Sequence, residues 1–327
     1  MKAWAIGAVA LGLALPAHGN DTTATIGVGG LQFAQNENVR MLSEDLYLSM
    51  DEVRVTYEFE NLTDTDQHVL IAFPMPDIES SPYEMAGFPT DDPENFFGFS
   101  TTFDGQPVEA ELYQSAFALG VDRTKELQKL GVPLAPHLLS TEDAINALPE
   151  ADRQVLVSIG ALGPHPYDDS GFYSPAWTLK SAYLWDAVFP AGEIVEVHHR
   201  YTPGLGGTVA ATFIDTEYGQ RAEYEEKYCL EDNLVAAVER TLTSPDEPWS
   251  APFTEAWLTY ILSSGANWAH SIGTFRLTVD KGSVDNFVSF CGEGVTKTGP
   301  TTFEMVQEDF YPWQDIEVLF VVRRDDY

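Results

Sequence analysis

The chain has 327 residues, of which 44% are hydrophobic, 12% aromatic and 21% charged. This balance is typical of a globular protein and excludes a disordered or collagen-like chain. Acidic residues outnumber basic ones by 51 to 17, which gives a formal net charge of −34. A surface with this charge would repel nucleic-acid phosphates and anionic lipid headgroups, so we expect neither as a partner. The sequence has no run of about 18 apolar residues, which is the length that a transmembrane helix needs.

The first nineteen residues have the pattern of a secretory signal peptide. Lys2 precedes an apolar run over 3–15, and 17–19 are Ala-His-Gly, with small residues at the two positions that a signal peptidase reads. A buried N-terminal helix is the alternative, but the sequence turns abruptly polar at Asn20. We therefore predict cleavage after Gly19 and a periplasmic or secreted mature chain.

The chain has two cysteines, Cys229 and Cys291. An oxidising compartment favours a disulfide between them. The functional alternative is a nucleophilic Cys291, which lies in the segment Phe-Cys-Gly-Glu-Gly at 290–294. A second cysteine in an exported chain favours the disulfide.

The first half of the mature chain reads mainly as strands. Apolar and polar residues alternate over 53–60, and a second strand over 69–73 is expected to end at Pro74, because proline cannot donate to a strand ladder. The polar, proline-containing segment 78–95 predicts a long surface loop. A hairpin is predicted over 96–112, with its turn at 104–107.

A helical insertion is predicted near 113–160, with helices over 122–130, after the N-cap cluster at 140–143, and over 150–159. Segment 160–175 predicts a loop. Further strands are predicted over the ranges 182–189, 194–201, 274–279, 288–291, 302–306 and 316–322. Helices are predicted within 216–243 and from Glu255 to Ser263, the second capped by Thr254 and stopped by Gly265.

The predicted fold class is mainly β (α+β): an antiparallel β-sandwich with helical insertions. We expect antiparallel pairing because the connections are too short for parallel crossovers. After the leader at 1–19, residues 20–215 form the sandwich with the insertion near 113–160. Residues 216–327 supply helices and antiparallel strands, which either complete the same domain or form a second one.

Several separated motifs resemble an uncharacterised family of exported proteobacterial proteins, domain of unknown function 4424. They include Phe-Pro-Met-Pro-Asp-Ile at 73–78, His-Arg-Tyr-Thr-Pro at 199–203, Gly-Ala-Asn-Trp at 265–268, and Val-Ser-Phe-Cys-Gly-Glu-Gly at 288–294. The family carries no assigned activity, so the resemblance implies no catalytic residues. A weaker likeness in layout is to the vault/inter-alpha-trypsin β-sandwich, which suggests an interaction module.

Metal and cofactor motifs are sparse. His198 and His199 are neighbours in a predicted strand, so they point to opposite faces, and we expect one in the core and the other at the surface. No zinc-binding spacing is present, and no cofactor is predicted. The sequence leaves open a calcium-binding site, because pairs of acidic residues lie in predicted loops. None of these pairs continues into a calcium-loop pattern. These pairs are Asp64/Asp66, Asp91/Asp92 and Asp168/Asp169.

No local catalytic motif is present, neither a Gly-x-Ser-x-Gly elbow nor Ser-x-x-Lys with its partner motifs. Our leading hypothesis is therefore an exported, non-enzymatic module that binds another envelope or extracellular protein or a glycan. The alternative is an exported hydrolase whose site is assembled from distant loops, around 78–95 or 160–175. That alternative predicts a deep pocket that holds at least two ionisable side chains with shifted pKa values.

Overall fold

A computed structural model describes residues 20–27, 30–80, 92–164, 173–215, 221–244 and 247–324. The predicted leader at 1–19 lies outside these ranges. The described chain is mainly β, with several antiparallel sheets and five α-helices, which confirms the predicted fold class. Among the described residues, none of the helices is long and apolar enough to cross a membrane.

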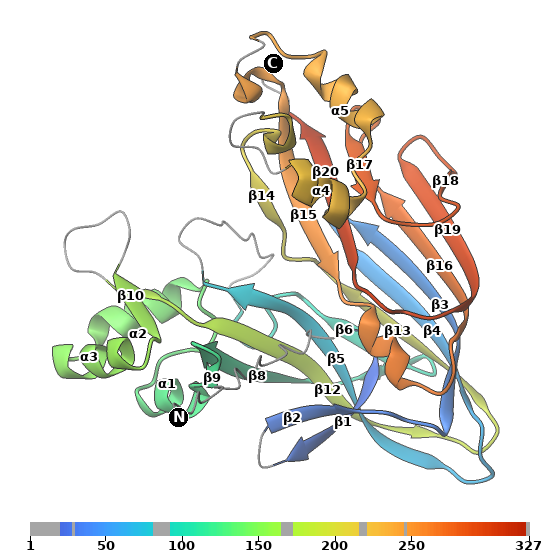
Figure 1. Cartoon of the computed structure of the whole chain (residues 1–327). Helices are drawn as coiled ribbons and strands as arrows, with labels where there is room; N and C mark the ends of the chain where they lie inside the picture. Colours follow the sequence, from blue (N-terminus) through green and yellow to red (C-terminus); the bar gives the residue numbers. More distant parts are fainter. Residues whose placement is uncertain are drawn as a thin grey trace, which may run out of the picture.

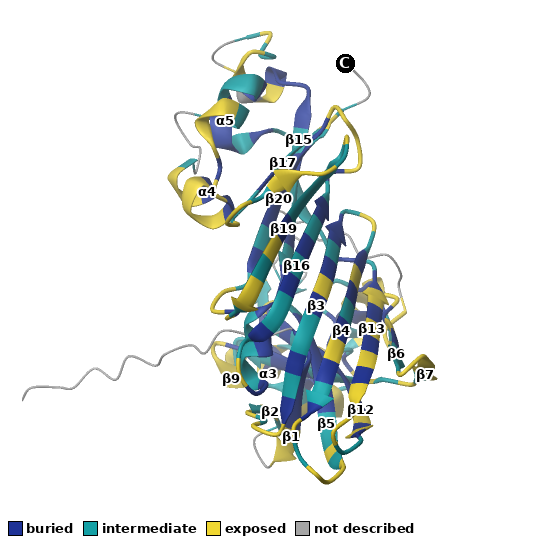
Figure 2. Cartoon of the chain, turned by 90° about the vertical axis from the view of Figure 1, so that its right-hand side faces the viewer, coloured by how far each residue is buried: buried dark blue, intermediate teal, exposed yellow. Residues whose placement is uncertain are grey.

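The largest sheet has eight strands and forms one layer of the sandwich. Side chains alternate between buried and exposed along its middle strands, as the bands of Figure 2 show, and this confirms the period of two predicted for 53–60. The strand order is β18 (Thr296–Lys297), β19 (Thr302–Phe310), β16 (Ile272–Asp280), β3 (Val39–Ser49), β4 (Val53–Asn61), β13 (Ile194–Tyr201), β6 (Ser100–Phe103) and β7 (Gln106–Val108).

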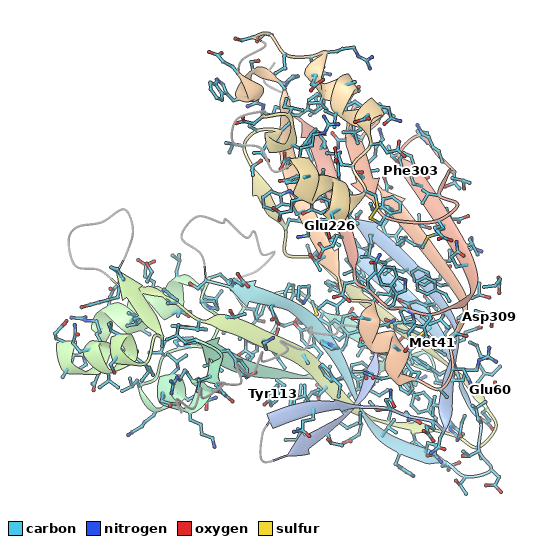
Figure 3. The ribbon with its side chains drawn as sticks, in the orientation of Figure 1. Met41, Glu60, Tyr113, Glu226, Phe303 and Asp309 are labelled. Carbon is cyan, nitrogen blue, oxygen red and sulfur yellow. A yellow bond between two sulfur atoms is a disulfide. The ribbon has the colours of Figure 1, made fainter. Side chains whose placement is uncertain are left out.

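A six-stranded sheet forms the second layer. Its order is β2 (Gly30–Ala34), β1 (Thr22–Gly27), β5 (Gln67–Glu79), β12 (Thr178–Phe189), β8 (Glu111–Ala118) and β9 (Val121–Asp122). The two layers share one apolar core, in which the rings of Phe59 and Phe189 lie 5.7 Å apart. Side chains fill the space between the layers in Figure 3. The predicted sandwich is therefore present.

Strand β5 differs from the prediction because it does not end at Pro74 but continues to Glu79. Pro74 lies opposite Ala182 of β12, and the register shifts between Leu179 and Ser181, opposite the segment that contains Pro76. This irregularity accommodates the prolines, which lack a donor for a regular ladder. Of the predicted loop at 78–95, residues 81–91 lie outside the described residues.

The predicted helices of the insertion are present at one end of the six-stranded sheet (Figure 1). They are α1 (Thr124–Lys129), α2 (Leu139–Ala147) and α3 (Glu150–Ser158), followed by the hairpin of β10 (Leu162–Pro164) and β11 (Tyr173–Pro175). Buried Trp177 ties the insertion to the sheet by donating from its indole nitrogen to the carbonyl of Leu134, at 2.8 Å. The beginning of the predicted insertion is strand β8, not helix, because it pairs along β12.

A four-stranded sheet extends the structure beyond the sandwich (Figure 1). One face joins the main core, and the other is covered by helices. Its order is β14 (Gly206–Thr208), β15 (Phe253–Tyr260), β20 (Ile316–Arg323) and β17 (Phe287–Phe290), and the covering helices are α4 (Arg221–Tyr228), α5 (Asp232–Glu239) and the 3-10 turns η1 (Thr212–Ile214) and η2 (Pro248–Ser250).

The prediction of a helix from Glu255 to Ser263 is wrong, because this segment is strand β15 up to Tyr260. It pairs with β20 along its whole length, and its side chains contribute to the apolar clusters on both faces of the sheet. A strand buried on two faces loses clear alternation, so its apolar residues imitate helical spacing. Only the short 3-10 turn η3 (Ser263–Asn267) is helical here.

One pairing departs from the antiparallel expectation. Strand β16 lies parallel to β3, with Leu277 opposite Leu46, so that the second half of the chain completes the large sheet. More than two hundred residues separate the two strands, so the chain between them is long enough for a parallel crossover.

Candidate functional site

A cleft of about 500 Å³ opens where the end of the sandwich meets helix α4 and strand β15. Its walls combine aromatic rings with carboxylates and one lysine. We call it the inter-sheet cleft, and its lining residues are Pro76, Asp77, Ile78, Glu79, Phe97, Tyr201, Pro203, Gly204, Gly206, Glu223, Tyr224, Lys227, Tyr228, Trp257 and Thr259.

Helix α4 supplies one wall of the cleft from a single face. Glu223 and Lys227 are four residues apart, as are Tyr224 and Tyr228, and residues at this spacing lie side by side on a helix. The two tyrosine rings contact each other, with centroids 5.2 Å apart. Both rings are also buried against the four-stranded sheet, so they anchor the helix while they border the cleft.

Behind this wall, the carboxylate of Glu255 is buried and accepts several hydrogen bonds. Tyr224 donates its hydroxyl hydrogen to Glu255 Oε2 at 2.7 Å, and the hydroxyl of Thr212 donates to both carboxylate oxygens at 3.1 Å. Burial raises the pKa of Glu255 and also that of Tyr224. This carboxylate holds Tyr224 in place.

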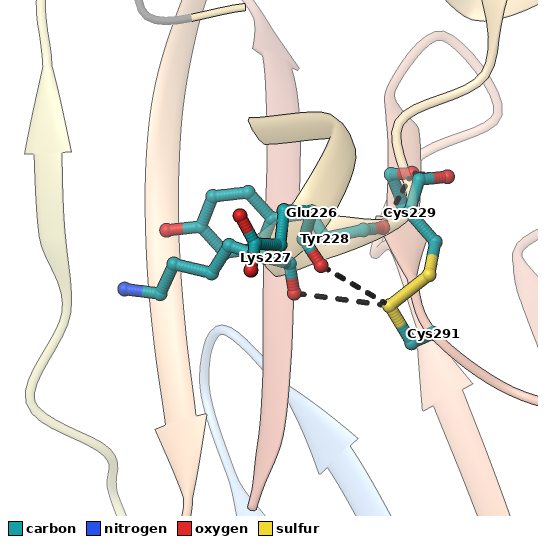
Figure 4. Close-up of a disulfide and its surroundings, with 6 residues drawn as sticks. Glu226, Lys227, Tyr228, Cys229 and Cys291 are labelled. Carbon is teal, nitrogen blue, oxygen red and sulfur yellow. Dashed lines mark hydrogen bonds between the residues drawn. A yellow bond between two sulfur atoms is a disulfide. The ribbon is translucent and has the colours of Figure 1, made fainter. Parts of the chain in front are cut away.

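The disulfide Cys229–Cys291 fastens the C-terminal end of α4 to the end of β17 (Figure 4). The Cys291 sulfur lies 3.8 Å from the carbonyl oxygen of Lys227, and Ser289 donates to the carbonyl of Tyr228 at 3.0 Å. The predicted cysteine pair is therefore joined. The disulfide holds the helix that forms a wall of the inter-sheet cleft.

A wider groove of about 820 Å³ lies on the other side of Lys227, along the disulfide and the end of β19. Its floor includes the stacked rings of Phe275 and Phe310, whose centroids are 4.5 Å apart. Trp313 borders it and is 73% exposed. No described aromatic residue of this groove lines the inter-sheet cleft.

A second concentration of polar side chains is buried in the sandwich, which we call the buried polar cluster. It comprises Asn20, Asp21, Glu44, His199 and Tyr260, all at most 2% exposed. His199 Nε2 lies 3.0 Å from Asp21 Oδ1. Glu44 accepts from the side-chain amide of Asn20 at 2.8 Å and from the Tyr260 hydroxyl at 3.3 Å.

Burial shifts the acid groups of this cluster. It raises the pKa of Glu44 to about 8, and the hydrogen bonds from Asn20 and Tyr260 offset only part of this effect. Burial also raises the pKa of Asp21, and the neighbouring His199 partly opposes the shift. Because the cluster is enclosed, it supports the fold and does not face a ligand.

The free energy of unfolding of the full chain is expected to fall as the pH rises from about 4.5 to about 8. Over this range the unfolded chain loses the Glu44 proton, whereas the folded chain retains it. Protonated Glu44 therefore contributes on the order of a few kcal/mol of stability at low pH, and this contribution is lost as the pH rises toward the pKa of the folded state. Urea unfolding at several pH values measures this slope. Glu44→Gln should flatten it, whereas Glu109→Gln, at an exposed position, should not. A stability that rises with pH in both chains would contradict the prediction.

The histidine prediction is confirmed. His199 is buried in the cluster, whereas His198 points to the opposite face, where it contacts Thr56 at 2.7 Å and Glu196 at 2.8 Å. Trp177, Trp185 and Trp268 lie in the core, as most sandwich tryptophans do.

The acidic pairs considered for calcium are placed only in part. Asp66 accepts the backbone N–H of Ala191 at 3.0 Å, and Asp92 accepts that of Glu94 at 3.0 Å. Asp91, Asp168 and Asp169 lie outside the described residues. Within the described ranges, no group of three or more histidine, cysteine or acidic side chains is arranged to hold a metal ion.

The sequence interpretation missed both sites. The cleft brings together residues from position 76 to position 259, which no local pattern can reveal. Glu44 did leave a signal, because it precedes Leu46 and Leu48 on the buried face of β3. A glutamate at such a position predicts a buried acidic group with a partner.

The stacked sheets with helices inserted at their ends define an α+β protein of the β-sandwich type. The chain belongs to the family described as Domain of unknown function (DUF4424), whose profile matches residues 19–319. No curated protein matches the sequence.

Two of the solved structures that are similar to the chain align with most of its length. One is a Legionella pneumophila protein proposed to bind nutrients, with 13% identity and a TM-score of 0.44, where the match covers 93% of this chain and 70% of that one. The other is an M1 zinc metallopeptidase from Deinococcus radiodurans, with 8% identity and a TM-score of 0.24. That match covers 88% of this chain and 43% of the metallopeptidase.

Proposed function

We propose that the chain is exported after removal of residues 1–19 and acts as a non-enzymatic binding module, with a short oligosaccharide as ligand of the inter-sheet cleft. The aromatic walls of the cleft carry this proposal. Its volume of about 500 Å³ lies within the range of small-molecule sites. The disulfide is consistent with export.

The chemistry of the walls favours a sugar. Aromatic side chains offer flat apolar faces to the C–H groups of a sugar ring, and carboxylates accept hydrogen bonds from its hydroxyls. Trp257 is the partly exposed ring, while Asp77, Glu79 and Glu223 supply the carboxylates. A ligand that lay between α4 and β5 would contact both kinds of group.

The cleft gives less support to the hydrolase alternative. The lining groups with shifted pKa values are Tyr201, Tyr224 and Tyr228, and burial raises all three. A tyrosine with a raised pKa stays protonated near neutral pH, so it is a poor general base. Glu255 lies behind Tyr224, where its oxygens already accept hydrogen bonds.

Trp257→Ala is expected to weaken oligosaccharide binding by about tenfold or more, because it removes a stacking surface of the cleft. The measurement is calorimetric titration of the purified chain with defined envelope oligosaccharides. Trp313→Ala is the matched control, since this exposed ring borders the other groove, and it should leave the affinity unchanged.

Equal affinity in the Trp257→Ala and Trp313→Ala variants would contradict the proposed cleft. Binding of cationic peptides without any oligosaccharide binding would refute the sugar assignment. Mass spectrometry of the ligand after incubation tests catalysis: an unchanged ligand is expected, and turnover that one cleft substitution abolishes would favour the hydrolase.

A further inference from the structure

The first described segment starts at Asn20, and its first residues lie in the interior of the molecule. Asn20, Asp21 and Thr22 are completely buried. The Asn20 backbone N–H donates to the hydroxyl of Ser264, which in turn donates to the Asn20 carbonyl. The Trp268 indole donates to the Asp21 carbonyl at 2.5 Å.

The slot around this segment is tight. A Cβ atom on Gly265 would lie 2.7 Å from the side-chain nitrogen of Asn20, so the glycine is required for this close approach. Asn267 adds a hydrogen bond to the hydroxyl of Thr22 at 2.9 Å. The 3-10 turn η3 and Trp268 therefore hold Asn20 at one defined position.

This position lies among acidic groups, and none of the described lysine or arginine side chains is paired with Asp21 or Glu44. The ionisable neighbours are Asp21 and Glu44 with the imidazole of His199, and beyond them the tyrosines Tyr57 and Tyr260, whose hydroxyls lie 3.0 Å apart. Two acceptors of the cluster, Asn20 Oδ1 and Asp21 Oδ2, are buried and have no hydrogen-bond partner among the described residues. An additional cationic donor would supply a positive charge to the acidic groups and hydrogen bonds to these acceptors.

We propose that cleavage of the Gly19–Asn20 peptide bond is a maturation step that places the α-ammonium group of Asn20 in the buried polar cluster, as the counter-ion of Glu44 and Asp21. This inference rests on the export proposed above. A peptidase of the secretory route adds water across the amide, so that Gly19 leaves with a carboxylate and Asn20 keeps the amine, which takes up a proton near neutral pH. The ammonium then has three N–H donors where the amide had one.

The burial of Asn20 sets the order of events. Its side of the peptide bond is inaccessible in the folded molecule, so cleavage has to precede insertion of the segment. A chain that keeps its leader would carry a neutral amide at this position, so Glu44 would have to stay protonated because no ammonium group balances its charge.

The test compares a chain that begins at Asn20 with one that carries Ser-Gly before Asn20. Acetylation of the α-amine by an activated ester at pH 7, followed by mass spectrometry, should be at least about tenfold slower in the folded Asn20 chain than in the same chain in urea. The Asn20 chain should also melt several degrees higher than the extended chain. With Glu44→Gln in both chains this difference should shrink, whereas a purely steric penalty of the extension would persist.

Protein purified from the native host allows the cleavage site and the counter-ion role of the amine to be tested separately. We expect it to begin at Asn20. An uncut leader, or a cut elsewhere, would overturn both the export site and the counter-ion. A cut before Asn20 with an amine that reacts as fast as in urea would overturn the counter-ion alone and leave export intact.

Discussion

Replacement of both Cys229 and Cys291 by serine is expected to lower the free energy of unfolding by about 4 kcal/mol. The disulfide spans 62 positions of the sequence, and its loss restores the conformational freedom of that loop in the unfolded chain. Urea unfolding followed by tryptophan fluorescence measures the loss. The effect should also reach the inter-sheet cleft, because α4 buries Tyr224 and Tyr228 as its inward-facing side chains and depends on the bond for its position.

Chemical reduction supplies the control. Dithiothreitol should destabilise the native chain by a similar amount and should leave the double serine variant unchanged. A serine variant as stable as the native chain would show that the fold does not depend on this bond. A stability loss with unchanged oligosaccharide affinity would show that α4 keeps its place without it.

His199→Leu is expected to destabilise the fold by about 3–5 kcal/mol at pH 7, because it leaves the buried Asp21 carboxyl group without the imidazole that lies 3.0 Å from its Oδ1. His199 is enclosed by aromatic rings: the centroids of Phe73 and Trp185 lie 4.8 Å and 5.3 Å from its own. A water molecule therefore has no room to take over the contact of the imidazole with Asp21. Burial raises the pKa of Asp21. Protonation of Asp21 relieves the cost, so the loss should become smaller as the pH falls toward 4.

His198→Leu is the matched control, since the neighbouring side chain points to the surface. It should change the free energy of unfolding by no more than about 0.5 kcal/mol. Adding Asp21→Asn to His199→Leu should restore part of the lost stability, because it removes the unpaired charge. Equal stability of the two single histidine variants would refute the structural role assigned to the cluster.

Local patterns predicted much of the secondary structure because they are created by each segment's own residues. The alternation in β13 does not depend on distant contacts, and α2 and α3 form where helices are predicted. The predicted N-cap cluster at 140–143 does not cap α2, because the helix begins at Leu139 and its N-cap residue is Leu138. The errors occurred where a distant partner decides. Strand β5 continues past Pro74 because β12 pairs with it and shifts its register opposite the segment that contains Pro76. Segment β15 is a strand because β20 pairs with it along its length.

The sequence by itself determined the strand-rich class, the helices of the insertion and the family, since these follow from residue spacing and from motifs read along the chain. Only the tertiary structure decided that β16 lies beside β3, that α4 faces β5 across a cleft, and that Asn20 meets Glu44. Contacts between residues far apart in the chain are set by how the sheets stack and which faces exclude water. No single segment encodes that outcome, so the two candidate sites came into view only with the fold.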